Sequence, residues 1–179
     1  MNPGDDLHGR ARRVRLVVLD ADGVLTDGSI TVFADGNEAR SFFSRDGLAV
    51  KLGQRAGLRF AVISGRTSKV VEARSRELGF VECVQGAHDK AGELREMAAR
   101  QSVALDEIVF VGDDLVDLAP MRLAGLAAAP ADADATARAA AHWVCTSGGG
   151  RGAVREVIEL VLRAQGTWDR VTAVYHGRD

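Results

Sequence analysis

Apolar runs alternate with amphipathic stretches along most of the chain, and this alternation restricts the folds that the sequence can adopt. The three strongest runs cover residues 14–20, 58–64 and 107–113. Their apolar residues are nearly continuous, as is typical of parallel strands that are covered on both faces. Strands that alternate with helices predict an α/β fold with a doubly wound, Rossmann-like and mainly parallel sheet.

The remaining elements are predicted from helical spacing, cap residues and turn signals. We expect helices at residues 46–57, 67–79, 89–101, 114–125 and 152–165, and weaker strands at 80–86, 125–130 and 142–147. Residues 29–43 interrupt the alternation with two β-like arms around Asp35-Gly36, which predicts a short β-hairpin inserted after the first strand. Residues 166–179 have no strong pattern, and we expect a mobile tail there.

Composition is that of an ordinary globular domain. The chain has 179 residues, 46% hydrophobic and 27% charged, so we expect a single domain over 1–179 with its core at about 14–165. The net charge of −2 does not indicate a nucleic-acid or membrane partner, and the basic segment 9–15 is interpreted as a solvated tail. No signal peptide or membrane-length apolar stretch is visible, and Cys83 and Cys145 lack metal-like spacing, so we expect a cytoplasmic protein.

Polar side chains stand at the carboxyl ends of the three strongest strands. They are Asp20 and Asp22 after the first strand, Ser64 after the second, and Asp113 and Asp114 after the third. Lys90 opens the helix that follows the weaker strand at 80–86. Ligands of open α/β sheets bind beyond the carboxyl ends of the strands, so we expect these side chains to converge on one site.

The chemistry of this set points to a phosphate bound beside a cation. Carboxylates that lie close together repel one another unless a cation or a proton lies among them. Carboxylate oxygens, water and substrate phosphate are the ligands that Mg²⁺ prefers. The ammonium group of Lys90 and the hydroxyl group of Ser64 can stabilise phosphoryl oxygens.

Four motifs together resemble those of the haloacid dehalogenase-like phosphatase superfamily. They are DADG at residues 20–23, the serine of VISGR at 62–66, Lys90, and GDD at 112–114. The resemblance implies that Asp20 is the nucleophile and Asp22 the general acid and base. It implies that Ser64 and Lys90 stabilise the transferring phosphoryl group. It further implies a Mg²⁺ ion held by Asp20, the backbone carbonyl of Asp22, and Asp113, with Asp114 in support.

A narrower resemblance comes from the lengths between motifs and from further motifs. The segment between the first strand and residue 46 is too short for a cap domain, which predicts a capless enzyme. The order of motifs resembles that of phosphatases acting on 3-deoxy-D-manno-octulosonate 8-phosphate (KDO 8-phosphate). The motifs are DADGVLTDG at 20–28, RDG at 45–47, ISGR at 63–66, QGAHDK at 85–90, VGDDLVD at 111–117 and GGGRGAVREV at 148–157.

This second resemblance implies a substrate, a set of substrate contacts and an assembly. The substrate would be a small sugar-acid phosphate in lipopolysaccharide precursor synthesis. The contacts would come from Asp22, Phe43, Ser44, Arg45, Asp46, Gly47, Lys51, Gly65, Arg66, Arg74 and Lys90. The assembly would be a homotetramer in which hairpins pack centrally and subunits share active sites.

Two departures from the family pattern concern the identity of the sugar. Phe43-Ser44 stands where Asn-Val is usual, and Lys51 stands where Arg is common. Phosphatases of nonulosonate 9-phosphates share the architecture but tend to have Glu at the positions of Arg66 and Arg151, so KDO 8-phosphate is favoured.

Two readings from other functional classes fit the sequence less well. A receiver-like signalling module would carry its phospho-accepting Asp on a middle strand, whereas Ser64 ends the second strong strand here. A catalytically silent scaffold is disfavoured because every catalytic position is filled.

Overall fold

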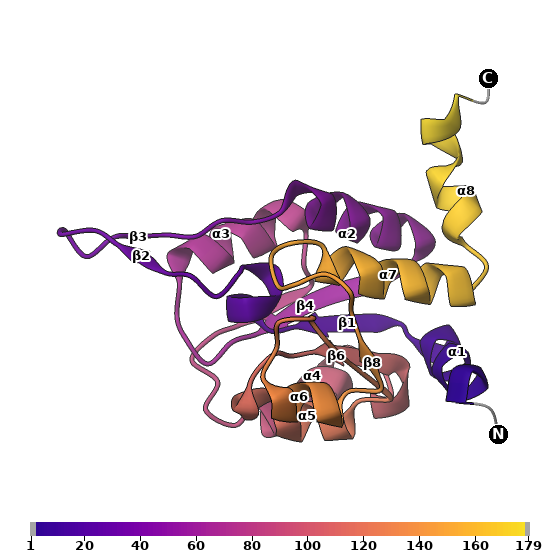
Figure 1. The fold of residues 1–179 in the computed structure, drawn as a ribbon, viewed down its shortest axis with the longest axis horizontal. Coiled ribbons are helices and arrows are strands. Elements are labelled where there is room, and N and C mark those ends of the chain that lie inside the picture. The colour runs from indigo at the N-terminus through magenta and orange to yellow at the C-terminus, as the bar shows by residue number, and fades with distance from the viewer. Residues whose placement is uncertain (1–2, 178–179) are drawn as a thin grey trace.

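The computed structural model describes residues 3–177, and a six-stranded sheet forms its centre (Figure 1). The strands are β1 (Leu16–Leu19), β4 (Arg59–Ile63), β5 (Glu82–Val84), β6 (Ile108–Val111), β7 (Leu126–Ala129) and β8 (Trp143–Val144). Their order is β5-β4-β1-β6-β7-β8, and every pairing in this sheet is parallel. The predicted doubly wound α/β fold is confirmed, with the strand that precedes Asp20 near its centre.

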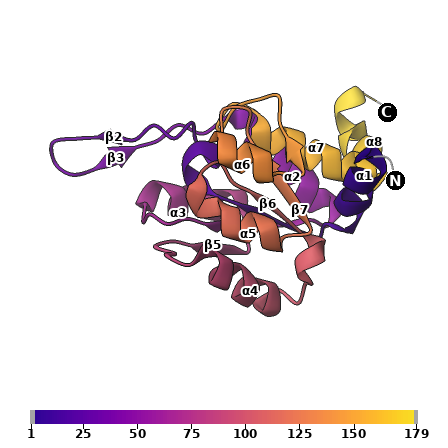
Figure 2. The ribbon, with the colours of Figure 1, turned by 60° about the horizontal axis from the view of Figure 1, so that its bottom comes forward.

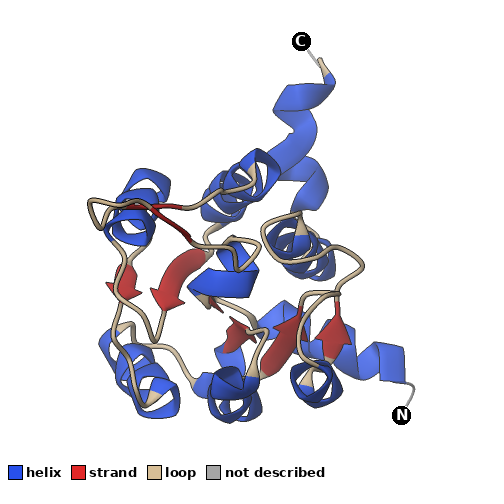
Figure 3. Cartoon of the chain, turned by 60° about the vertical axis from the view of Figure 1, so that its left-hand side comes forward, coloured by secondary structure: helices blue, strands red, loops and turns tan. Residues whose placement is uncertain are grey.

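Helices cover both faces of the sheet (Figures 1 and 3). One face packs against α1 (Pro3–Arg13), α2 (Ser44–Ala56), α3 (Lys69–Leu78) and α7 (Ala153–Ala164). The other packs against α4 (Lys90–Arg100), α5 (Leu118–Leu123) and α6 (Ala135–Ala140). Within residues 3–177, no helix combines the length and the apolarity that crossing a membrane requires.

Local signals in the sequence explain where three of these helices begin or end. Helix α2 ends at Gly57, whose φ of +99° suits a residue without a Cβ atom. The side chain of Ser68 accepts a hydrogen bond from the Val71 N–H at the start of α3. Asp89 accepts one from the Gly92 N–H in the same way at the start of α4. The α4 cap places Lys90 in the first turn, beside the carboxyl edge of the sheet.

The predicted hairpin is present and projects from the body of the molecule (Figures 1 and 2). Its antiparallel strands, β2 (Thr31–Val32) and β3 (Glu38–Ala39), are only two residues long each. Asp35 shapes the turn between them by accepting a hydrogen bond from the Asn37 N–H. Val32 and Phe33, which lie just before this turn, are exposed.

Both terminal segments differ from the expected tails. The basic segment 9–15 is largely part of α1, because Ala11 and Val14 are buried in the core. Arg12 donates to the Ala164 carbonyl across 3.1 Å, so this segment is anchored to the body of the protein. Arg12, Arg13 and Arg15 nevertheless remain exposed to solvent. At the other end, a mobile tail was expected over 166–179, but the described residues form α8 (Trp168–Thr172) and a 3₁₀ turn (Ala173–His176). Residues 178–179 lie outside the described part of the chain. Helix α8 contacts α2 and α7, which buries Val171.

Candidate active site

The carboxyl ends of β1 and β6 bring three carboxylates together. Asp20 continues β1, and its N–H donates to the Val111 carbonyl across 3.0 Å. Asp20, Asp113 and Asp117 each offer an oxygen that lies within 4.8 Å of the other two. Asp20 and Asp117 are buried, and Asp113 is half-buried. Figure 3 shows this edge of the sheet, with the hairpin side turned forward.

Lys90 lies among these acids, as expected. Its ammonium nitrogen is 2.8 Å from Asp20 Oδ1 and 2.7 Å from Asp117 Oδ1. Burial lowers the pKa of Lys90, but the negative charges of Asp20 and Asp117 outweigh burial and leave the pKa raised. Lys90 therefore stays charged and neutralises part of the acid cluster.

The acid cluster has the properties of a metal site. Burial raises the pKa of Asp113 to about 8, with the nearby charges of Asp20, Asp117 and Asp114 adding to the rise. Burial, with a contribution from Asp117, also raises the pKa of Asp20 from 3.8 to about 6. Asp113 Oδ1 is buried, and none of residues 3–177 donates a hydrogen bond to it. An oxygen-ligated divalent cation fits this set, because it would offset the repulsion and occupy the unpartnered oxygen.

Asp117 is a site residue that sequence reasoning missed. Its side chain is fully buried and accepts hydrogen bonds from the N–H groups of Asp113 and Asp114, across 3.0 and 3.3 Å. The 3₁₀ turn Leu115–Asp117 folds the chain back so that Asp117 faces Lys90. An available signal was the spacing in GDDLVD, where an acid three residues after a capping Asp can face the helix start. Asp114 itself is exposed and caps this turn through the Leu115 N–H.

Glycines allow the acidic loop to lie this close to its neighbours. Gly23 has a φ of +90°, and a Cβ atom there would overlap the Asp113 carboxylate. A Cβ atom on Gly149 would overlap the Gly23 carbonyl. The Gly150 N–H donates to the Val24 carbonyl across 2.9 Å. The glycine-rich segment at 148–152 therefore packs directly on the loop that carries Asp22.

Asp27 lies at the base of the hairpin. Its side chain accepts from the Ser29 N–H and forms an ion pair with Arg151 across 2.9 Å. Arg151, for which the sequence suggested no role, thus links the glycine-rich segment to the start of the hairpin.

Asp22 faces two arginines rather than the acid cluster. Arg66 Nε is 3.7 Å from one of its oxygens, and Arg40 forms an ion pair with the other. The Arg66 N–H also donates to the buried Ser64 hydroxyl oxygen across 3.3 Å, so Asp22, Ser64, Gly65 and Arg66 lie together. Arg40 was not predicted from the sequence.

The remaining predicted substrate residues lie along α2 and α3. Lys51 donates to the Leu78 carbonyl across 2.7 Å, at the end of α3. Arg74 pairs with Glu77 across 2.9 Å and stacks over Phe42, with its guanidinium carbon 5.5 Å from the ring centre. Among residues 3–177, no hydrogen bond or ion pair connects Lys51 or Arg74 to the acid cluster.

Residues 43–47, which were also predicted to contact the substrate, lie at the start of α2 and contact Arg74 of α3. Asp46 is buried, accepts from the Arg155 N–H across 2.8 Å, and has a pKa raised by its burial. Arg45 lies over Phe43, with its guanidinium carbon 5.8 Å from the ring centre. Gly47 packs against the Arg74 guanidinium. Ser44 lines a shallow pocket of about 480 Å³ with Arg74.

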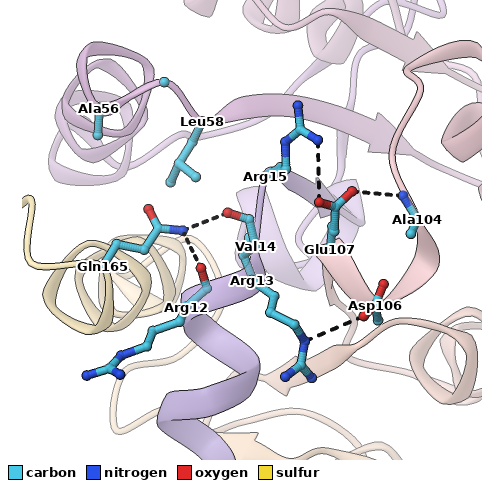
Figure 4. Close-up of a pocket in the computed structure, with 11 residues that line it drawn as sticks. Arg12, Arg13, Val14, Arg15, Ala56, Leu58, Ala104, Asp106, Glu107 and Gln165 are labelled. Carbon is cyan, nitrogen blue, oxygen red and sulfur yellow. Dashed lines mark hydrogen bonds and ion pairs between the residues drawn. The ribbon is translucent and has the colours of Figure 1, made fainter.

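A larger cavity of about 600 Å³ lies at the opposite end of β1 and contains none of the predicted site residues (Figure 4). Its acids are paired with its arginines. Arg13 lies 3.6 Å from Asp106, and Arg15 lies 3.4 Å from Glu107. Because it is remote from the acid cluster, this cavity does not belong to the candidate active site.

Comparison with known protein families leads to the same interpretation of the site without using its geometry. The family model for haloacid dehalogenase-like hydrolases matches residues 49–158. The chain belongs to the haloacid dehalogenase-like hydrolase family. Hydrolases of this family use Mg²⁺, in agreement with the acid cluster.

Particular relatives extend the match to nearly the whole chain. The 3-deoxy-D-manno-octulosonate 8-phosphate phosphatase of Escherichia coli is 38% identical over 164 residues, which are 92% of this chain and 87% of the relative. The phosphatase of the same name from Yersinia pestis is 37% identical over 170 residues, which are 95% and 91% of the two chains.

Solved structures agree with this relationship. The Moraxella catarrhalis 3-deoxy-D-manno-octulosonate 8-phosphate phosphatase, in complex with magnesium, phosphate and KDO, has a TM-score of 0.93 and 34% identity. That match covers 96% of this chain and 98% of the other. The Yersinia pestis enzyme has a TM-score of 0.90 and 38% identity, covering 92% and 89%.

Proposed function

We propose that this chain hydrolyses KDO 8-phosphate to KDO and inorganic phosphate. The observation that carries the proposal is the cluster of Asp20, Lys90 and Asp113, in a chain that matches KDO 8-phosphate phosphatases over about nine-tenths of its length. One domain performs the reaction, in the cytoplasm and in the synthesis of lipopolysaccharide precursors.

The side chains support a reaction in two displacements. In the first, an Asp20 oxygen attacks phosphorus, the bond from phosphorus to the sugar oxygen breaks, and Asp22 gives that oxygen a proton. In the second, water attacks the phosphorus of the phospho-aspartate while Asp22 takes a proton from the water. The bond between phosphorus and the Asp20 oxygen breaks, which regenerates the Asp20 carboxylate and releases inorganic phosphate. Lys90 and Ser64 stabilise the phosphoryl oxygens during both displacements.

Mg²⁺ would be held by Asp20, Asp113 and the backbone carbonyl of Asp22. It supplies positive charge that reduces repulsion between the anionic nucleophile and the anionic phosphate. Asp117 orients Lys90 and the backbone of Asp113 through the hydrogen bonds described above.

The substrate contacts are divided between subunits in our proposal. Arg66 lies beside Asp22 and binds the sugar acid in the active site of its own subunit. Lys51 and Arg74, which make no bond to the acid cluster among residues 3–177, contribute to the site of another subunit. The proposed assembly is a homotetramer in which the exposed Val32 and Phe33 of the hairpins pack together.

The test is phosphate release from three substrates: KDO 8-phosphate, a nonulosonate 9-phosphate and p-nitrophenyl phosphate. Each is measured with Mg²⁺ and with a chelator. We expect the highest kcat/KM on KDO 8-phosphate and loss of activity with the chelator. Preference for the nonulosonate 9-phosphate would replace the proposed substrate with that sugar acid. Activity on the aryl phosphate alone would contradict a sugar-acid phosphatase.

A further inference from the structure

Arg40 has a buried guanidinium group although it lies at the base of an exposed hairpin. It follows β3 directly, and its side chain has no exposed surface. Burying a cation is costly unless it is paired and hydrogen-bonded. Arg40 forms ion pairs with Asp22 and with Glu38, and its Nη2 donates a hydrogen bond to Glu38 across 3.2 Å. Among residues 3–177, its Nε and Nη1 atoms have no hydrogen-bond acceptor, so the charge is stabilised mainly by these two carboxylates. The return arm of the hairpin is thereby bonded to the second acid of the DADG motif.

The contacts continue from Glu38 into the core. The second oxygen of Glu38 accepts from the hydroxyl of Ser68, the residue that caps α3. The Ser68 N–H donates to the Gln85 side chain across 2.5 Å. Asp22 is thus connected through Arg40, Glu38 and Ser68 to the start of α3 and to Gln85, the residue that follows β5.

The geometry restricts the Asp22 carboxylate on both sides. Arg40 pairs with Oδ1, while Arg66 Nε lies 3.7 Å from Oδ2. The Arg66 side chain is 59% exposed, whereas the Arg40 side chain has no exposed surface, so the Arg40 side chain is the more restricted of the two partners. A proton donor works only when its orientation is close to that of the reacting geometry, and an error of about 1 Å can cost a hundredfold in rate.

We infer that Arg40 is a positioning residue for Asp22: it fixes the orientation of this carboxylate for proton transfer, and Glu38 and Ser68 fix Arg40. This inference rests on the proposed role of Asp22 as general acid and base. Arg40 does not touch the reacting atoms in this account. Its loss should therefore lower kcat and leave KM nearly unchanged.

The test measures kcat and KM on KDO 8-phosphate and on p-nitrophenyl phosphate for Arg40→Met, Arg40→Lys and the control Arg76→Met. Arg76 is an exposed helix arginine paired with Glu72. We expect Arg40→Met to lower kcat about 10- to 100-fold with KM within about twofold, and Arg40→Lys to retain part of the activity. Arg76→Met should behave like the wild type.

A double-mutant cycle separates positioning from general stabilisation of the fold. In an Asp22→Asn background, Arg40→Met should cause no further loss of kcat, because Arg40 acts through the Asp22 carboxylate. An equal fold-loss in both backgrounds, or no loss in the wild-type background, would overturn the inference. If Arg40→Met does not fold, Glu38→Gln takes its place in the double-mutant cycle. We then expect a smaller loss of kcat in the wild-type background and no further loss in the Asp22→Asn background. If the wild type releases phosphate only from the aryl substrate, the proposed function fails, while the cycle on that substrate still decides the role of Arg40.

Discussion

The ammonium nitrogen of Lys90 lies 2.7 Å from a carboxylate oxygen of Asp117, and both side chains are buried. The same nitrogen contacts Asp20, and Asp117 also accepts from the backbone of the loop that carries Asp113. One fully buried carboxylate therefore fixes two parts of the acid site. Breaking such a pair by removing one partner is costly, about 3–5 kcal/mol, because the other charge remains buried.

Asp117→Asn tests this arrangement with a side chain of the same shape. The amide keeps a hydrogen-bond acceptor but loses the charge that holds Lys90. We expect kcat to fall about 10- to 100-fold, as for other residues that orient an active-site group, with the fold retained. The matched control is Asp106→Asn, whose carboxylate is exposed and remote from the site. Equal activity of the two variants would show that Asp117 does not orient Lys90.

Mg²⁺ should stabilise the protein more at pH 8 than at pH 6. Burial raises the pKa of Asp113 from 3.8 to about 8 and that of Asp20 to about 6. Metal-free folded protein thus holds protons that the unfolded chain has released, so its stability falls as pH rises from about 4 to about 8. A bound cation requires the ionised carboxylates, so the gain in Tm on adding Mg²⁺ should grow over the upper part of this range.

The measurement is thermal unfolding with and without saturating Mg²⁺ at several pH values. Asp113→Asn is the control, because it removes the carboxyl with the larger shift and should flatten the pH dependence. A Mg²⁺-induced shift in Tm that is the same at pH 6 and pH 8 would contradict the protonation of Asp113 in the metal-free protein.

Gly149→Ala should lower both stability and activity. A Cβ atom at this position would overlap the Gly23 carbonyl, so the loop that carries Asp22 must move. Forcing a methyl group into close packing costs about 1–3 kcal/mol. Gly9→Ala is a matched control, because a Cβ atom on Gly9 in α1 would meet no atom of the described part of the chain within 4 Å. Chemical denaturation and kcat of both variants check this, and wild-type values for Gly149→Ala would rule out the tight contact.

Shared active sites predict that two defective subunits can complement each other. Asp20→Asn removes the nucleophile, whereas Arg74→Ala removes a group proposed to serve another subunit. Mixed and allowed to exchange subunits, the two variants should give more activity than the sum of the separate preparations. A mixture with only the summed activity would place Arg74 outside the neighbouring site.

The parts of the fold that depend on local sequence could be predicted. A continuous apolar run identifies β1, and the rule that ligands bind at carboxyl edges places Asp20 and Asp113 together. Helix α8 could not be predicted, because Val171 becomes buried only where α2 and α7 offer a surface.

Two residues of the site could not be predicted, because their contacts depend on how the chain folds back on itself. Asp117 reaches Lys90 only because the chain turns back after Asp114. Arg40 is separated from Asp22 by the whole hairpin, so their contact depends on how the return arm lies against the core.

Phosphate release from KDO 8-phosphate by the wild type and by Asp20→Asn, in the presence of Mg²⁺, tests the central claim most directly. We predict steady turnover by the wild type and a loss of at least about a thousandfold in the variant. Far-ultraviolet circular dichroism should show that the variant keeps its fold. Wild-type turnover by Asp20→Asn would contradict the account, because no other side chain is proposed to accept the phosphoryl group.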